Sequence, residues 1–177
     1  MELRTQVKTL EEQSAAKDNQ LAAQRLTIDK LHQQLQSVRG WTDEDMKVIF
    51  TPEKIEIASL SGGEDYDGKP GDDGVTVYIR PIDREGDVLK AAGDLRVELY
   101  DLAAPAGENL LGQYSIPVVQ AAEHWYGKFA TNHYTIRCPW RQGPPKHEEI
   151  TIRATFVDYL TQRVMTAQTT CKVRLPA

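Results

Sequence analysis

The spacing of the apolar residues changes from a period of seven to a period of two near residue 41, and no other feature constrains the fold as much. Before this point, apolar residues recur alternately four and three positions apart, as in an α-helix with one apolar stripe. After it, they alternate with polar residues, as in half-buried strands. We therefore expect a helix over residues 1–40, a connection over 41–45 and a β domain over 46–177.

The heptad frame runs without a break from Leu3 to Val38, and eight of its eleven positions are aliphatic. These eight seam positions are Leu3, Val7, Leu10, Leu21, Ile28, Leu31, Leu35 and Val38. The other three positions are Ser14, Lys17 and Gln24, which give the seam a polar centre. The helix contains neither Gly nor Pro before Gly40, which then supplies a stop.

Such a seam buries its apolar side only against another helix or a folded domain. At about 1.5 Å per residue the helix would extend roughly 54 Å, which is longer than a small domain. We therefore expect a coiled coil and a homo-oligomer, whose number of chains stays open. The alternative is a single amphipathic helix that packs on a partner or folds back.

The region from residue 46 predicts seven or eight short strands that are separated by turns rich in Gly, Pro and Asp. A turn near Leu160–Arg163 would close the last hairpin, and Pro117–Trp125 suits a short helix. Because no long helix intervenes, we expect an antiparallel, immunoglobulin-like β-sandwich. Its inward positions would include Ile55, Ile57, Val75, Val77, Ile79, Leu95, Val97, Leu99, Tyr114, Ile116, Tyr134, Ile136, Cys138, Ile150, Ile152, Ala154, Phe156, Met165, Ala167, Cys171, Val173 and Leu175.

The charge balance argues against two classes of partner. Lys and Arg number 21 against 26 Asp and Glu, a formal net charge of -5, so we expect no binding to nucleic acid or anionic membranes. No stretch approaches the roughly 20 apolar residues of a membrane span, and Met1–Arg4 does not open a signal peptide. We expect a cell-envelope or periplasmic location if an upstream signal was removed, and a cytoplasmic one otherwise.

An acidic, glycine-rich loop is the sharpest local motif. Its candidate calcium ligands are Asp65, Asp67, Asp72 and Asp73, because hard cations prefer several carboxylate oxygens. The EF-hand pattern fails at its fifth, sixth and twelfth positions. We favour the alternative, a solvated loop in which Asp and Gly serve turn geometry, and so expect no cofactor.

Cys138 and Cys171 share the inward parity of their strands. They could form a disulfide across the core, which would indicate an oxidising compartment, or remain free core thiols. The sequence leaves these two alternatives open.

No catalytic motif stands out. The four histidines lack metal-ligand spacing, and neither a nucleophile elbow nor a phosphate-binding glycine loop occurs, so we expect no enzyme. Trp125 and Trp140 are the first residues of two aromatic clusters that could bind a glycan or a protein. The favoured alternative is that their rings cover the core at strand ends.

The chain resembles exported bacterial proteins of uncharacterised function that combine a coiled coil with a β-sandwich. The resemblance lies in Leu60–Asp83 (LSGGEDYDGKPGDDGVTVYIRPID) and Gly93–Leu102 (GDLRVELYDL), placed behind a heptad helix. It implies an envelope location and a role in assembly. We therefore expect an oligomeric structural or interaction protein with a protein or glycan partner. The alternatives are a calcium- or carbohydrate-binding module and, third, a hydrolase with an unrecognised site.

Overall fold

The computed structural model describes residues 17, 21, 24–28, 30, 50–128 and 131–176, in two units, Met1–Ile49 and Phe50–Ala177. All described residues before residue 50 are helical and exposed, and they include the seam residues Leu21 and Ile28. No helix in the described part of the chain has the length and hydropathy of a membrane span. The remaining aliphatic seam residues, which lie outside the described residues, are Leu3, Val7, Leu10, Leu31, Leu35 and Val38.

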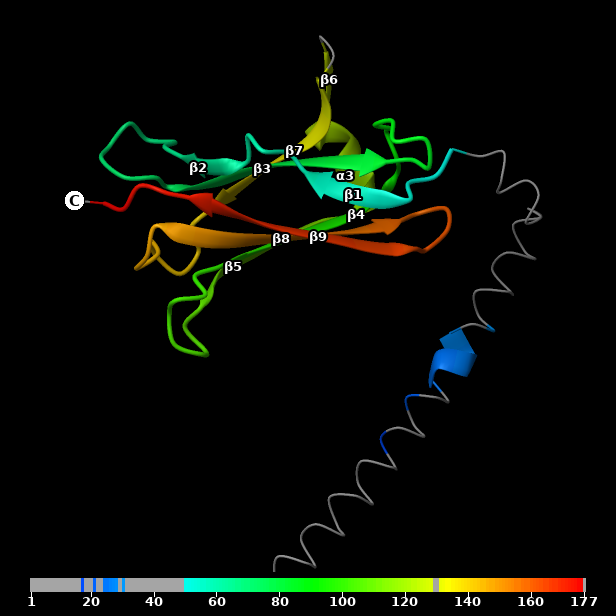
Figure 1. The fold of residues 1–177 in the computed structure, drawn as a ribbon, viewed down its shortest axis with the longest axis horizontal. Helices are drawn as coiled ribbons and strands as arrows, with labels where there is room; N and C mark the ends of the chain where they lie inside the picture. The colour runs from blue at the N-terminus through cyan, green and yellow to red at the C-terminus, as the bar shows by residue number, and fades with distance from the viewer. Residues whose placement is uncertain are drawn as a thin grey trace, which may run out of the picture. The chain divides into compact units, whose positions relative to one another are not determined.

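The second unit contains two antiparallel sheets (Figure 1), which confirms the prediction of a mainly β domain. The five-stranded sheet has the order β1 (Lys54–Ile57), β3 (Gly74–Ile82), β7 (Thr131–Pro139) and β6 (Trp125–Lys128), and β2 (Gly62–Glu64) also pairs with β3. The four-stranded sheet has the order β5 (Leu110–Ile116), β4 (Gly93–Tyr100), β8 (Glu149–Asp158) and β9 (Val164–Lys172).

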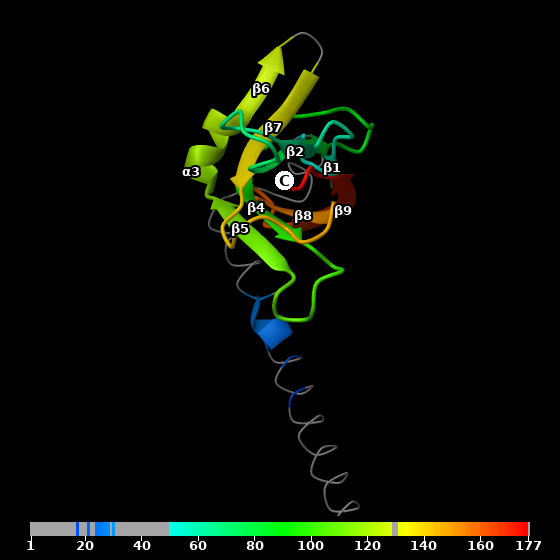
Figure 2. The ribbon, with the colours of Figure 1, turned by 90° about the vertical axis from the view of Figure 1, so that its left-hand side faces the viewer.

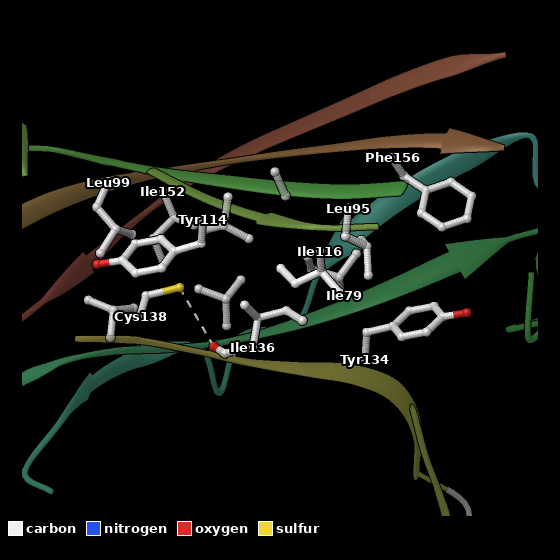
Figure 3. Close-up of a cluster of buried hydrophobic side chains, with 14 of the residues drawn as sticks. Ile79, Leu95, Leu99, Tyr114, Ile116, Tyr134, Ile136, Cys138, Ile152 and Phe156 are labelled. Carbon is white, nitrogen blue, oxygen red and sulfur yellow. Dashed lines mark hydrogen bonds between the residues drawn. The ribbon is translucent and has the colours of Figure 1, made fainter. Parts of the chain in front are cut away.

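The core lies between the two sheets, where alternate residues of each strand meet (Figure 3). The alternation works because successive side chains of a strand point to opposite faces. At one end, Tyr134 of β7 and Phe156 of β8 have ring centroids 6.3 Å apart, and both residues are almost fully buried. Full burial of one such apolar side chain stabilises a fold by about 1.5–3 kcal/mol, so this layer supplies a large part of the driving force.

The predicted short helix is present. Helix α3 (Val118–Ala121) follows Pro117 and continues into the 3₁₀ turn η1 (Ala122–His124). Trp125 then opens strand β6, which the sequence pattern did not predict. Strands β6 and β7 form a hairpin that extends beyond the rest of the sheet (Figure 2).

The predicted turn of the last hairpin is also present, between β8 and β9. The Asp158 carboxylate accepts hydrogen bonds from the backbone N–H and the hydroxyl of Thr161, at 2.8 and 2.6 Å. Gln162 has a φ of 60° there, a left-handed conformation that such a turn needs at one position. Arg163, which follows, pairs with Glu53 just before β1 at 2.7 Å.

Candidate functional site

A row of four polar and aromatic residues crosses the outer face of the five-stranded sheet. Glu56 of β1 stands opposite Arg80 of β3, and His133 of β7 stands opposite Tyr126 of β6. The pairing of β3 with β7 ends at Ile79 and Tyr134, one residue before Arg80 and His133, and these two residues line the same groove. Four strands from distant parts of the sequence thus assemble one surface, which we call the outer row.

The aromatic rings of this surface contact one another. Tyr126 stacks on His133 with centroids 5.5 Å apart and an interplanar angle of 25°. Tyr78 meets the same imidazole edge-on, at 4.8 Å and 80°. Burial, and then the charge of Arg80, lower the pKa of His133 from its usual value. The imidazole is therefore neutral near pH 7 and offers one donor and one acceptor.

A groove of about 590 Å³ lies over the outer row. Its walls come from β3, β6 and β7 and from the connections that follow β1 and β3. Leu60 and Val88 line it from those connections, and Leu60 is 83% exposed. The volume falls in the range of about 300–1,000 Å³ that is typical of small-molecule sites.

Arg80 is the one charged residue that lines the groove among the described residues. One of its terminal nitrogens, Nη2, donates to Glu56 at 3.3 Å, and Glu56 also accepts from Lys54 at 2.7 Å. The hydrogen bond from Lys54 lowers the pKa of Glu56, although burial acts in the opposite direction. The Nε of Arg80 is buried and has no hydrogen-bond partner within the described part of the chain.

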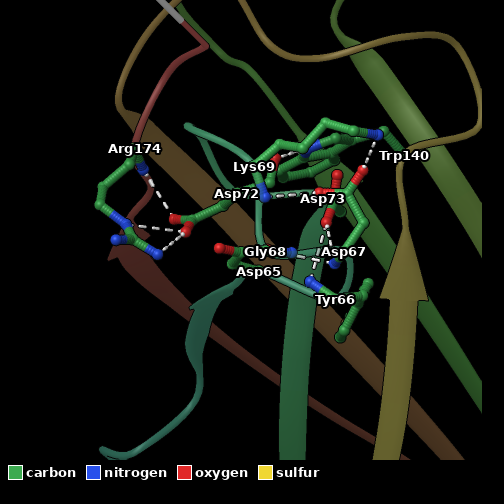
Figure 4. Close-up of polar contacts among 9 residues, drawn as sticks. All are labelled: Asp65, Tyr66, Asp67, Gly68, Lys69, Asp72, Asp73, Trp140 and Arg174. Carbon is green, nitrogen blue, oxygen red and sulfur yellow. Dashed lines mark hydrogen bonds and ion pairs between the residues drawn. The ribbon is translucent and has the colours of Figure 1, made fainter.

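Three of the predicted calcium ligands come together in the acidic loop (Figure 4). Ligand oxygens of Asp65, Asp67 and Asp73 lie within 4.8 Å of one another. Asp65 accepts the N–H groups of Asp67 and Gly68, at 3.1 and 2.6 Å. Asp73 accepts those of Tyr66 and Asp67, at 2.8 and 3.0 Å. These contacts close tight turns, which is the role that Asp commonly has in such loops.

The fourth predicted ligand, Asp72, serves another purpose. Its buried carboxylate accepts hydrogen bonds from the backbone N–H of Arg174 and from Nε and Nη2 of the Arg174 guanidinium, so it ties the loop to the C-terminal segment. Its backbone carbonyl accepts the indole N–H of Trp140 at 2.6 Å.

Both predicted tryptophans lie against the core. Trp125 and Trp140 are partly buried there, and the Trp125 ring meets Tyr134 edge-on at 4.9 Å. Strand alternation turns the next residue, Tyr126, to the outer face instead. The open aromatic surface of this domain therefore contains tyrosine and histidine.

Cys138 and Cys171 are free thiols in the structure, on strands of opposite sheets. Cys138 is buried, and its Sγ lies 3.8 Å from the carbonyl oxygen of Ile136 (Figure 3). Burial raises the pKa of the Cys138 thiol to about 12 and that of Cys171 to about 11. Both thiols are thus protonated at neutral pH and are poor nucleophiles.

A hydrogen-bonded pair that the sequence analysis missed joins two connections of the sandwich, and its carboxylate is buried. Both carboxylate oxygens of Asp101, after β4, lie 2.9 Å from Nδ1 of His147, before β8. The backbone N–H groups of Ala103 and Lys146 donate to the same carboxylate at 3.2 Å. Although burial opposes ionisation, these hydrogen bonds, led by that from His147, hold the pKa of Asp101 below its usual value.

We compared the chain with protein-family models, curated proteins and solved structures, and found no match. Any functional proposal must therefore follow from the residues themselves. Among them, the groove over the outer row combines open aromatic rings with polar groups, and the exposed helical leucines offer a second surface.

Proposed function

We propose that the protein is a non-enzymatic interaction protein. In this proposal the N-terminal helices associate as a coiled coil, and immunoglobulin-like β-sandwich heads present the binding surfaces. The observation that carries it is the exposure of Leu21 and Ile28, which are 55% and 50% exposed on helical residues one heptad apart. Burying these side chains between chains would gain hydrophobic free energy that the isolated chain lacks.

The buried charges of the head support a structural role. In the described part of the chain, Asp72 pairs with Arg174, and Asp101 pairs with His147. Glu98 of β4 pairs with Arg153 of β8 at 2.6 Å. Each of these acids already has a hydrogen-bonding side-chain partner, which favours a rigid scaffold over a reactive centre.

Association of the helices would give the heads multivalency. Linking several heads raises the effective concentration of each binding site without a new contact. For the location of this assembly we extend the proposal to the cell envelope, on the strength of the resemblance to exported bacterial proteins.

The test is light scattering on the full chain and on two matched variants. Leu21→Ser removes a seam leucine, whereas Leu26→Ser removes a leucine that is 71% exposed on the opposite side of the same helix. Both lose the same helix propensity. We expect an oligomer that Leu21→Ser weakens and Leu26→Ser preserves. An intact chain that is monomeric at tens of micromolar, or equal effects of the two substitutions, would overturn the proposal.

A further inference from the structure

We propose that the groove over the outer row binds a neutral oligosaccharide. A saccharide presents hydroxyl groups around a ring whose faces are largely C–H, so its site needs both aromatic surface and hydrogen-bonding groups. The groove supplies both. Tyr78, Tyr126 and His133 give the aromatic surface, and Arg80 and nearby hydroxyl residues give the polar groups.

Charge selects a neutral ligand over an anionic one. Arg80 is the one cation among the described residues that line the groove, and its Nη2 pairs at 3.3 Å with Glu56, which also pairs with Lys54. His133 is neutral near pH 7, and the whole chain carries a formal charge of -5. An anionic ligand would therefore meet one cation that already has a carboxylate partner, which does little to offset the desolvation of a phosphate, sulfate or carboxylate.

The polar groups of Arg80 argue against a purely apolar ligand. A buried donor without a partner destabilises the folded state. The Nε of Arg80 is such a donor within the described residues. A ligand hydroxyl can accept a hydrogen bond from the Arg80 side chain, which a hydrocarbon cannot do.

The position of the groove suits an extended ligand. It lies open on a sheet face and is lined from β3, β6 and β7, with Leu60 at its edge. A chain of sugar rings can lie along such a surface. The inference adds a ligand to the proposed function but does not depend on helix association, because each head carries the complete groove.

The experiment uses the fluorescently labelled full chain on an array of neutral and anionic oligosaccharides. Titration calorimetry with the neutral oligosaccharides that bind then gives the affinity of one site. We expect Tyr126→Ala to weaken that affinity about tenfold or more, because a stacking ring is lost. The matched control is Tyr159→Ala. Tyr159 is 48% exposed and Tyr126 is 43% exposed, but Tyr159 lies in the β8–β9 turn. It should bind as the unmodified protein does.

Leu60→Asp is the second variant, because Leu60 lies in an exposed connection where substitution leaves the core intact. Leu21→Ser separates this inference from oligomerisation, since it should lower retention on the array and leave the calorimetric affinity unchanged. The inference fails if no neutral oligosaccharide binds, if only anionic ones bind, or if binding survives both Tyr126→Ala and Leu60→Asp. It also fails if decaproline, a probe for aromatic peptide grooves, occupies the groove and neutral oligosaccharides do not.

Discussion

Asp72 accepts three hydrogen bonds from Arg174, across 102 positions of the sequence. The backbone N–H donates at 2.7 Å, Nε at 3.0 Å and Nη2 at 2.8 Å. The Asp72 side chain is 3% exposed, whereas that of Arg174 is 71% exposed. The pair is therefore asymmetric, because loss of the arginine leaves a buried carboxylate with fewer donors.

We predict that Arg174→Ala lowers the free energy of unfolding by about 1–3 kcal/mol, the usual cost of leaving a buried polar group under-satisfied. Urea denaturation checks this value. Arg96→Ala is the control, because Arg96 is an exposed arginine of β4, and it should change stability by less than about 0.5 kcal/mol. Equal effects of the two substitutions would contradict a special role for the pair.

The acidic loop should behave as a folded turn rather than a calcium site. Asp73 accepts two backbone N–H groups, so we predict that Asp73→Ala, which removes the acceptor, destabilises the domain by about 0.5–1.5 kcal/mol. Neither millimolar calcium nor EDTA should move the Tm. A ligand that binds only the folded state must stabilise it, so a Tm that rises with calcium would contradict this prediction.

The alternation of apolar residues was sufficient to predict β3, β4 and β8, since each contributes a regular inward face to one core. It could not predict β2. Gly62 and Gly63 resemble a turn, yet a Cβ at Gly63 would lie 2.1 Å from the Asp72 carboxylate, so close packing requires glycine in this strand. Pairing with β3, rather than local propensity, makes it a strand.

The sequence did not predict the outer row either. Its members come from four strands, and only the pairing of β3 with both β1 and β7 brings Arg80 near Glu56 and His133. One available signal was parity, because Tyr78 and Arg80 occupy outward positions of a strand whose inward positions are apolar. Parity identifies the face but not the neighbours on it. The acidic loop, in contrast, could be found directly, because its residues are adjacent in sequence.

The buried carboxyl of Asp101 should make stability depend on acid pH. The pKa of Asp101 lies below its usual value in the folded state. A carboxyl of this kind stabilises the fold above its unfolded pKa, near 4, and loses that contribution as the pH falls through the lower folded pKa. We predict that Asp101→Asn is less stable at pH 7 and loses less stability than the unmodified protein between pH 5 and pH 2.

Urea midpoints across this pH range measure the effect. Glu108→Gln is the matched control, since Glu108 also has a lowered pKa, through its hydrogen bond with Lys146, but is 62% exposed. Solvent screening makes such an exposed pair contribute little. The urea midpoints of Glu108→Gln should therefore fall with acid pH as those of the unmodified protein do. If the midpoints of Asp101→Asn fall as steeply as those of the unmodified protein, the prediction is refuted.

Both cysteines should remain thiols and react slowly while the domain is folded. Burial raises their pKa values to about 12 for Cys138 and about 11 for Cys171, so the reactive thiolate is scarce at pH 8. We predict that iodoacetamide labels neither residue quickly at this pH and that both are labelled at once in urea. Cys171 should react first on longer exposure, because it is half-buried whereas Cys138 is fully buried. Mass spectrometry before and after reduction tests the same point, since a disulfide between these positions would appear as a mass lower by two hydrogens.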